Sequence, residues 1–204
     1  MRESASLNDP IFSDAGTATA LEFCDGTSPM YFDLNSDGSG HKAIILPVGG
    51  HREPVDIQHL IPHLIPFRQD ENAHWHRAID LQLDGPTVLS FSIQRVPAAV
   101  EKLLAYAGAV KEDVDYFVFH QANKMINETI RKKLGLSTEK VPSTLRKFGN
   151  TSSASLPVTM TVRINKELSA SRKRVLLSGF GIGLSWGACL VDIEGAKFPD
   201  LIES

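Results

Sequence analysis

The sequence predicts an α/β fold of three layers, in which helices cover both faces of a mixed, five-stranded sheet. Two observations carry this prediction: short apolar runs bounded by turn residues alternate with long segments of helical periodicity. The helical segments run from Gly85 to Ala107 and from Asn123 to Leu134. The runs expected to form strands are Ala15–Phe23, Met30–Leu34, Ala43–Val48, Tyr116–Phe119, Arg172–Leu177 and Leu184–Ile193.

The first helical segment repeats apolar residues at steps of three and four from Val88 onward, and Gly108 is placed to end it. Pro97 lies inside this segment, where it should kink the helix or divide it in two. The run Tyr116–Phe119 is continuously apolar, as expected for the buried middle of a sheet. In the second helix, Ile126, Ile130 and Leu134 share one face, which is therefore expected to be buried.

Composition restricts the class of protein. The chain has 204 residues, of which 42% are hydrophobic, and this is enough for one domain with its own core. Its net charge of −3 gives no reason to expect nucleic acid or an anionic membrane as a partner. No apolar run approaches the length of a membrane span, and two cysteines without CxxC spacing favour a reducing cytoplasm over a disulfide framework.

Two polar side chains stand out because each follows a structural boundary. His120 comes directly after the Tyr116–Phe119 run, and Asn150 lies 30 residues later behind Gly149. An imidazole and an amide are the donors needed to hydrogen-bond a thioester carbonyl or a developing enolate. A single histidine after a strand is more often structural, so the pair carries the hypothesis.

Three blocks around these residues resemble a known family. They are HQAN at 120–123, GNTSSAS at 149–155 and GFGIGLSWGA at 179–188. In this order they resemble the C-terminal half of β-ketoacyl-acyl-carrier-protein synthase III, a thiolase-fold condensing enzyme, over about Ile11 to Ile193. The resemblance implies a thiolase-like half and a Cys-His-Asn triad that performs decarboxylative Claisen condensation of an acyl thioester with a malonyl thioester, as in fatty acid biosynthesis.

The same resemblance implies that the N-terminal, Cys-bearing half is absent from residues 1–204. The chain alone is therefore expected to be inactive, with a large apolar face exposed where the other half would pack. It is expected to work as part of a complete acyltransferase, and a homodimer is expected to form through a sheet edge.

The resemblance also assigns further site residues. The backbone N–H of Ile182 would form part of an oxyanion hole, while Asn123, Gly85 and Leu89 would contact the pantetheine arm of coenzyme A. Asn123 is equally suited to cap a helix. The implied substrates are acyl-CoA and malonyl-ACP or malonyl-CoA, with no permanently bound cofactor.

A basic cluster suggests how a carrier protein could dock. Arg131, Lys132 and Lys133 could meet an acidic acyl carrier protein, together with Lys124. The alternative, a solvated helix face, explains the cluster equally well. Met125 stands where the family often carries an arginine.

Residues 49–84 hold five of the seven histidines and three prolines, and they are interpreted as a lid or insert near the acyl pocket. The pairs His59/His63 and His74/His76 have possible ligand spacings, but without a cysteine no metal site is expected. Two functional alternatives stay open. One is a non-catalytic subunit that binds acyl-CoA or shapes a pocket. The other is a condensing enzyme of specialised polysaccharide or polyketide metabolism.

Overall fold

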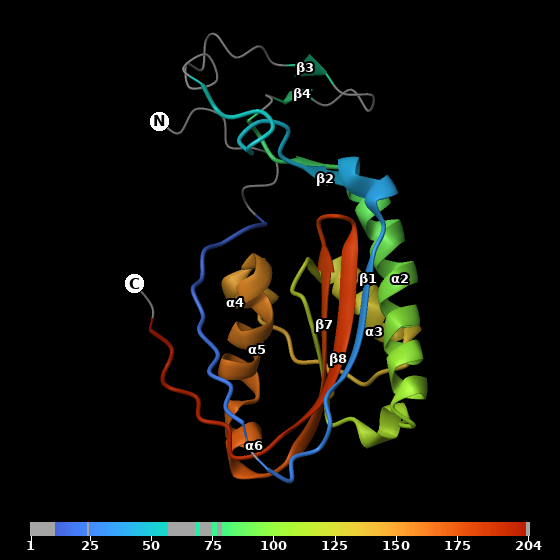
Figure 1. The fold of residues 1–204 in the computed structure, drawn as a ribbon, viewed down its shortest axis with the longest axis vertical. Helices are drawn as coiled ribbons and strands as arrows, with labels where there is room; N and C mark the ends of the chain where they lie inside the picture. Colours follow the sequence, from blue (N-terminus) through green and yellow to red (C-terminus); the bar gives the residue numbers. More distant parts are fainter. Residues whose placement is uncertain (1–10, 24, 57–67, 70–74, 77–78, 203–204) are drawn as a thin grey trace.

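A mixed four-stranded sheet organises the part of the chain that the structure describes (Figure 1). The computed structural model describes residues 11–23, 25–56, 68–69, 75–76 and 79–202. The sheet has the order β1-β8-β7-β6, with β6 parallel to β7 and the other pairs antiparallel. Its strands are β1 (Tyr31–Ser36), β6 (Tyr116–Phe119), β7 (Lys173–Gly181) and β8 (Ser185–Ile193).

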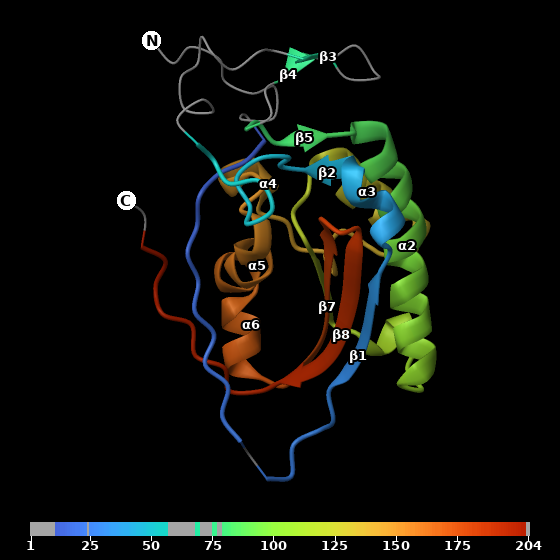
Figure 2. The ribbon, with the colours of Figure 1, turned by 45° about the horizontal axis from the view of Figure 1, so that its top comes forward.

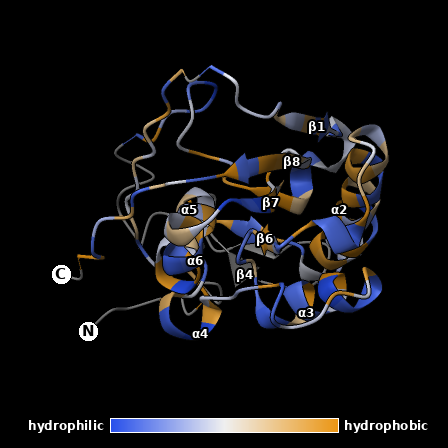
Figure 3. Ribbon diagram, turned by 90° about the horizontal axis from the view of Figure 1, so that it is seen from below, coloured by the Kyte–Doolittle hydropathy of each residue, from blue (hydrophilic) through white to orange (hydrophobic). Residues whose placement is uncertain are grey.

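Helices cover both faces of this sheet, so the predicted three-layered α/β class is confirmed (Figure 3). The helices α2 (Gly85–Tyr106) and α3 (Lys124–Lys133) lie on one face. The helices α5 (Ser155–Arg163) and α6 (Asn165–Ala170) lie on the other. The shorter elements are η1 (Gly38–Ala43), η2 (Lys111–Asp113), α4 (Leu145–Phe148) and η3 (Ser152–Ala154).

The prediction of five strands in the sheet is wrong by one among the described residues. Residues 15–23 form no strand, and their side chains are exposed, with Leu21 and Phe23 at 86% and 91%. An extended segment becomes a strand only where a neighbouring strand can pair with it, and residues 15–23 pair with no strand of this sheet. Of the run predicted from Ala43, only β2 (Ile44–Ile45) is a strand, and it pairs with β5 (Gln82–Leu83) outside the main sheet.

The β2–β5 pair lies over the end of the sheet that holds the β7–β8 turn (Figure 2). The turn is attached there, because Asp37 and Leu184 exchange two backbone hydrogen bonds of 2.8 and 3.0 Å. A second two-stranded ribbon joins β3 (Arg68–Gln69) to β4 (Trp75–His76). The strands β3, β4 and β5 lie within residues 49–84, the segment predicted as a lid or insert, whereas β2 precedes that segment.

The strand β6 is an edge strand rather than the middle of the sheet, yet Phe117, Val118 and Phe119 are fully buried. The loop after α3 covers the open edge, since the Phe117 N–H donates to the Lys140 carbonyl at 2.8 Å. The Lys140 ammonium also donates to three backbone carbonyls before β6, the shortest bond being 2.7 Å to Val114. A covered edge explains how a strand with one sheet neighbour can be apolar throughout.

The helix α2 is a single helix of 22 residues, so Pro97 does not divide it. Proline has no N–H to bond the carbonyl four residues earlier, which belongs to Ile93. The Lys133 ammonium donates to this carbonyl at 2.9 Å. A side chain of α3 therefore satisfies the acceptor that Pro97 cannot reach.

Two cores flank the sheet. The larger core joins the apolar faces of α2 and α3 to one sheet face and includes Val100, Phe119 and Ile130. The predicted buried stripe of Ile126, Ile130 and Leu134 is confirmed. The smaller core joins α5 and α6 to Val118 and Val175 on the other face. No helix in the described part of the chain is both long and apolar enough to cross a membrane.

Candidate active site

His120 follows β6 directly and is fixed through its backbone and its ring. Its N–H donates to the Ser178 carbonyl of β7 at 2.8 Å, and its carbonyl accepts from Asn127 Nδ2 at 3.0 Å. The imidazole meets the Phe180 ring edge to face, with 5.4 Å between the ring centres. The strand, the neighbouring strand and α3 thus place this side chain at the carboxyl end of β6.

The imidazole has one nitrogen engaged inside the protein. Its Nδ1 lies 2.8 Å from Ser155 Oγ, at the start of α5. Burial lowers the pKa of His120 below its ordinary value, and the nearby Ser152 backbone opposes part of that change. The ring is therefore neutral at neutral pH, as required of a hydrogen-bond donor that does not titrate.

Asn150 is buried and is held by the N-terminal segment of the chain. Its N–H donates to the Ile11 carbonyl at 2.9 Å, and its carbonyl accepts from the Ser13 N–H at 3.0 Å. Its side-chain Oδ1 accepts from the Ser152 N–H at 2.9 Å. With Oδ1 occupied, the amide presents Nδ2, for which no hydrogen-bond partner is found among the described residues.

The structure brings His120 and Asn150 to one short segment. Ser152 and Ser155 are separated by less than one helical turn, and Asn150 binds the first while His120 binds the second. The two atoms left without a partner in the described part of the chain, His120 Nε2 and Asn150 Nδ2, are both N–H donors when the ring is protonated on Nε2. Such a pair suits an oxygen atom that accumulates negative charge.

The glycine-bearing turn between β7 and β8 lies beside this pair. Phe180, which contacts the His120 ring, is the second residue before Ile182. Ile182 is 67% exposed, and within the described residues its backbone N–H has no hydrogen-bond partner. The Gly183–Leu184 peptide bond is cis, and Gly183 has a φ of 141°. The turn thus offers one free backbone donor near the histidine.

The three residues assigned to the pantetheine arm lie at this end of the fold. Asn123 caps α3, its Oδ1 accepting from the Ile126 N–H at 2.8 Å, so the structural alternative describes its contact. Gly85 is the exposed first residue of α2, and Leu89, one turn later, is half-buried against the larger core. Gly85 is open to a ligand, whereas Asn123 Oδ1 is already occupied.

The four cations of the predicted carrier-docking cluster differ in their contacts. Arg131 pairs with Glu128 at 2.8 Å and donates to the Leu136 carbonyl at 2.6 Å, which closes the end of α3. Lys133 is bound to the α2 carbonyl described above. Lys124 and Lys132 are exposed, and the described residues offer neither of them an ion-pair partner. Two of the four therefore support the fold directly.

Sequence reasoning missed three groups that hold the site. Ser155 and Gln121 are buried, and Gln121 Oε1 accepts from Ser143 Oγ at 2.8 Å and from the Thr144 N–H at 3.0 Å. The third group is the Ile11–Ser13 segment that binds Asn150. Both side chains lie inside the quoted motifs, but no pattern in the sequence reveals that their polar atoms face the imidazole and the neighbouring loop.

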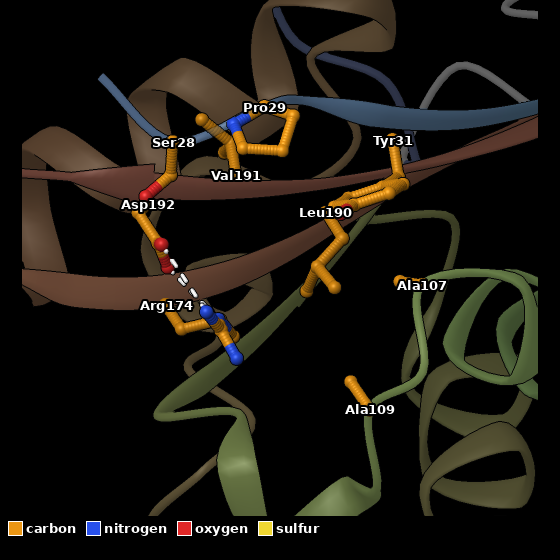
Figure 4. A pocket seen from close by; sticks show the side chains of 9 residues that line it. All are labelled: Ser28, Pro29, Tyr31, Ala107, Ala109, Arg174, Leu190, Val191 and Asp192. Carbon is orange, nitrogen blue, oxygen red and sulfur yellow. Dashed lines mark hydrogen bonds and ion pairs between the residues drawn. The ribbon is translucent and has the colours of Figure 1, made fainter. Parts of the chain in front are cut away.

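A small cavity lies elsewhere in the fold (Figure 4). It has a volume of about 100 Å³ and is bordered by the pair Arg174–Asp192, whose shortest bond is 2.9 Å. Arg174 is at the amino end of β7, whereas His120 binds Ser178 near the carboxyl end. Arg174 and Arg172 keep the pKa of Asp192 far below its usual range. This is a charged contact that joins β7 to β8, remote from the candidate site.

Only some of the residues that could bind a metal lie in the part of the chain that the structure describes. Among the described residues no three histidine, cysteine or acidic side chains are grouped as ligands. The side chains of the pairs His59/His63 and His74/His76 lie outside the described residues.

The fold was compared with solved structures of other proteins. Over 97% of its length the chain superposes on a solved 3-oxoacyl-(acyl-carrier protein) synthase of Burkholderia xenovorans, with 33% identity and a TM-score of 0.84. That superposition covers 53% of the other chain. A structure of the synthase III from Thermus thermophilus has 27% identity and a TM-score of 0.66. The fold is thus that of one half of a thiolase-like condensing enzyme.

Sequence comparison finds the same similarity. The family described as 3-Oxoacyl-[acyl-carrier-protein (ACP)] synthase III C terminal matches residues 104–193. The β-ketoacyl-[acyl-carrier-protein] synthases III of Gloeobacter violaceus and Streptococcus gordonii are 32% and 34% identical over 88% and 89% of this chain. The chain spans 51% and 55% of their lengths, about half. The chain is thus similar to the C-terminal half of β-ketoacyl-acyl-carrier-protein synthases III, which confirms the predicted resemblance.

Proposed function

We propose that the chain is the C-terminal half of a 3-oxoacyl-acyl-carrier-protein synthase III that performs decarboxylative Claisen condensation, as in fatty acid biosynthesis. One observation carries the proposal. His120 and Asn150 are both tied to the segment from Ser152 to Ser155, and each keeps one nitrogen without a partner among the described residues. Two fixed donors that converge on one oxygen would stabilise a developing enolate more than the neutral thioester, which is the condition for catalysis.

The reaction follows from these donors. A primer acyl group is first carried as a thioester on a cysteine. The C–C bond of a malonyl thioester then breaks, CO₂ leaves, and the electron pair passes into an enolate whose oxygen accepts hydrogen bonds from His120 Nε2 and Asn150 Nδ2. The carbanion attacks the acyl carbonyl, the Ile182 N–H stabilises the oxyanion that forms, and the cysteine thiolate leaves. Each donor is expected to contribute about 10²–10³ in rate.

The nucleophile is proposed to come from outside this chain. Cys189 lies on β8 opposite Phe32 and Leu177, and burial raises the pKa of its thiol. A nucleophilic cysteine needs the opposite change, toward thiolate. Cys24 lies outside the described residues. We therefore place the triad cysteine on an N-terminal half, and expect no acyl transfer from these 204 residues alone.

An uncovered apolar sheet face supports this division. The helix α5 packs over β6 and β7. On the same face, β1 directs Phe32 and Leu34 outward, 53% and 75% exposed, next to Cys189 and Gly187 of β8. A monomer that is complete seldom leaves such a face in water. The proposed N-terminal half would cover it.

The substrates and partners remain part of the proposal. Acyl-CoA would deliver the primer past Gly85 and Leu89 at the exposed start of α2, with Asn123 nearby. Malonyl-ACP, or malonyl-CoA, would deliver the extender. Among the predicted docking residues, Lys124 and Lys132 have their ammonium groups available for an acidic carrier protein. A homodimer in the cytoplasm completes the proposal.

The test uses a complete enzyme, made by joining this chain to its own N-terminal half. Malonyl-thioester decarboxylation and acyl condensation are measured separately for His120→Ala and Asn150→Ala. Each substitution should lower decarboxylation by about 10²–10³, and the double variant should lose less than the product of both, because the donors share one oxygen. Asn165→Ala, at the start of α6, is the matched control and should retain full activity.

The same experiment distinguishes the proposed enzyme from the non-catalytic alternative. A subunit that only binds acyl-CoA would show unchanged thioester binding in both variants and no decarboxylation in the wild type. Decarboxylation that ignores both substitutions would refute the proposed roles of His120 and Asn150. Profiling of acetyl, branched and aryl primers would distinguish fatty-acid initiation from specialised metabolism.

A further inference from the structure

Ser155 is the first residue of α5, and none of its surface is exposed. Its hydroxyl lies at the contact between α5 and the loop that follows β6. Two polar groups of that loop approach Oγ: His120 Nδ1 at 2.8 Å and the Gln121 N–H at 3.3 Å. Within the described chain the hydroxyl has no third partner.

The directions of these two bonds can be worked out. A backbone N–H only donates, so Ser155 Oγ accepts from Gln121. The hydroxyl still has one hydrogen to place. If Nδ1 carried the proton of the neutral ring and donated to Oγ, that hydroxyl hydrogen would be buried without an acceptor, which is unfavourable. If the hydroxyl donates to Nδ1 instead, every group at this contact is satisfied.

We infer that Ser155 is a positioning residue that fixes His120 in the tautomer protonated on Nε2, by donating its hydroxyl hydrogen to Nδ1. This inference deepens the proposed function, because that function needs an N–H at Nε2 for the thioester oxygen. Ser155 itself touches no substrate. It acts on the reaction only through the ring that it orients.

This arrangement reverses a familiar one. In a Ser-His-Asp triad the aspartate accepts a hydrogen bond from the Nδ1–H of the imidazole. This bond leaves Nε2 unprotonated and ready to take a proton. Here the group behind the ring donates, so Nε2 already holds its proton and the ring serves as a neutral donor. The lowered pKa of His120 agrees with this role, since burial disfavours the imidazolium.

The tautomer can be read directly by NMR on the 204-residue chain, without substrate or the other half. Long-range ¹H–¹⁵N correlation of histidine-labelled protein distinguishes a protonated ring nitrogen from an unprotonated one. The chain has seven histidines, so the His120 signals are identified as those missing from His120→Gln. The wild type should show Nε2 protonated and Nδ1 unprotonated. A ring protonated on Nδ1 would overturn the inference without any variant being made.

Ser155→Ala then removes the donor. The share of the Nδ1-protonated form should rise about tenfold, the factor that corresponds to one hydrogen bond. An unchanged tautomer in this variant would also overturn the inference. Ser92→Ala is the matched control, because Ser92 is equally buried in a helix and donates to the Val88 carbonyl at 2.7 Å, away from the site. This control should leave the His120 signals unchanged. Activity of the completed enzyme tests the proposed function separately, so the two can fail independently.

Discussion

Gly149 connects the N-terminal segment to the candidate site, and replacing it by alanine tests that connection. Gly149 has φ 60° and ψ −150°, a conformation essentially limited to glycine. A Cβ added there would lie 2.9 Å from the Ile11 carbonyl oxygen, closer than such atoms approach in proteins. That same oxygen accepts the Asn150 N–H. Gly149→Ala must therefore strain the backbone and displace the acceptor that holds Asn150.

The size of the effect follows from these two contributions. Backbone strain at such a position costs about 1–3 kcal/mol. Displacing Ile11 also weakens the bond to Asn150 and the neighbouring bond from the Ser13 N–H to the Asn150 carbonyl, each worth about 1 kcal/mol. The variant should lose about 2–5 kcal/mol of the free energy of unfolding. It should also lose activity in the complete enzyme, because Asn150 Nδ2 moves.

Urea unfolding of the chain measures the first effect, as a lower midpoint at an unchanged slope. Gly108→Ala is the control, because Gly108 has a φ of 63° but nothing within 4 Å of an added Cβ. It should lose only the strain of a left-handed residue, about 1–2 kcal/mol. If both variants unfolded at the same urea concentration, or if the Asn150 and Ser13 amide signals of Gly149→Ala kept their wild-type positions, the connection would be refuted.

Three further substitutions, with Lys132→Met as a control for one of them, test other contacts. Asp192→Asn should cost about 2–4 kcal/mol, because it breaks charged bonds to two arginines. Since the folded pKa of Asp192 is depressed, its contribution is complete above the unfolded value near 3.9 and is lost as the pH falls toward the folded value. Unfolding of wild type and variant should therefore converge in acid. Lys133→Met should cost about 0.5–1.5 kcal/mol by leaving the Ile93 carbonyl without its donor, and Lys132→Met less than about 0.5, by urea unfolding. Leu34→Glu should leave stability of the chain within about 0.5 kcal/mol, yet weaken its association with the N-terminal half in a titration.

The sequence predicts those elements whose determinants are local. The stripe of Ile126, Ile130 and Leu134 repeats at helical spacing, and all three residues are buried as expected. The Asn123 cap and the end of α3 at Gly135, with a φ of 67°, follow equally from neighbouring residues. His120 and Asn150 could be singled out because each follows a strand end or a glycine turn. Their partners could not, since Ser155 and Ile11 are reached only through the tertiary fold.

The errors come from non-local pairing. Residues 15–23 have a strand-like sequence, but a strand forms only where another strand is available to accept its hydrogen bonds. The run Tyr116–Phe119 looks like the centre of a sheet because its edge is covered by the Lys140 loop, which no periodicity reveals. Pro97 should break a helix on its own, yet Lys133 from α3 supplies the missing donor. In each case the deciding partner is distant in the sequence.

The two proposed donors depend on different parts of the chain. The described contacts of His120 come from β7, α3, Ala122 and the segment from Ser152 to Ser155, all within the residues that match the C-terminal family. Asn150 depends in addition on Ile11 and Ser13, which lie at the other end of the chain and outside that match. The histidine is therefore positioned by the core of this half, whereas the asparagine is positioned partly by the segment that precedes it. The proposed function requires both donors to point at one oxygen, so correct placement of that N-terminal segment is a condition for the proposed site.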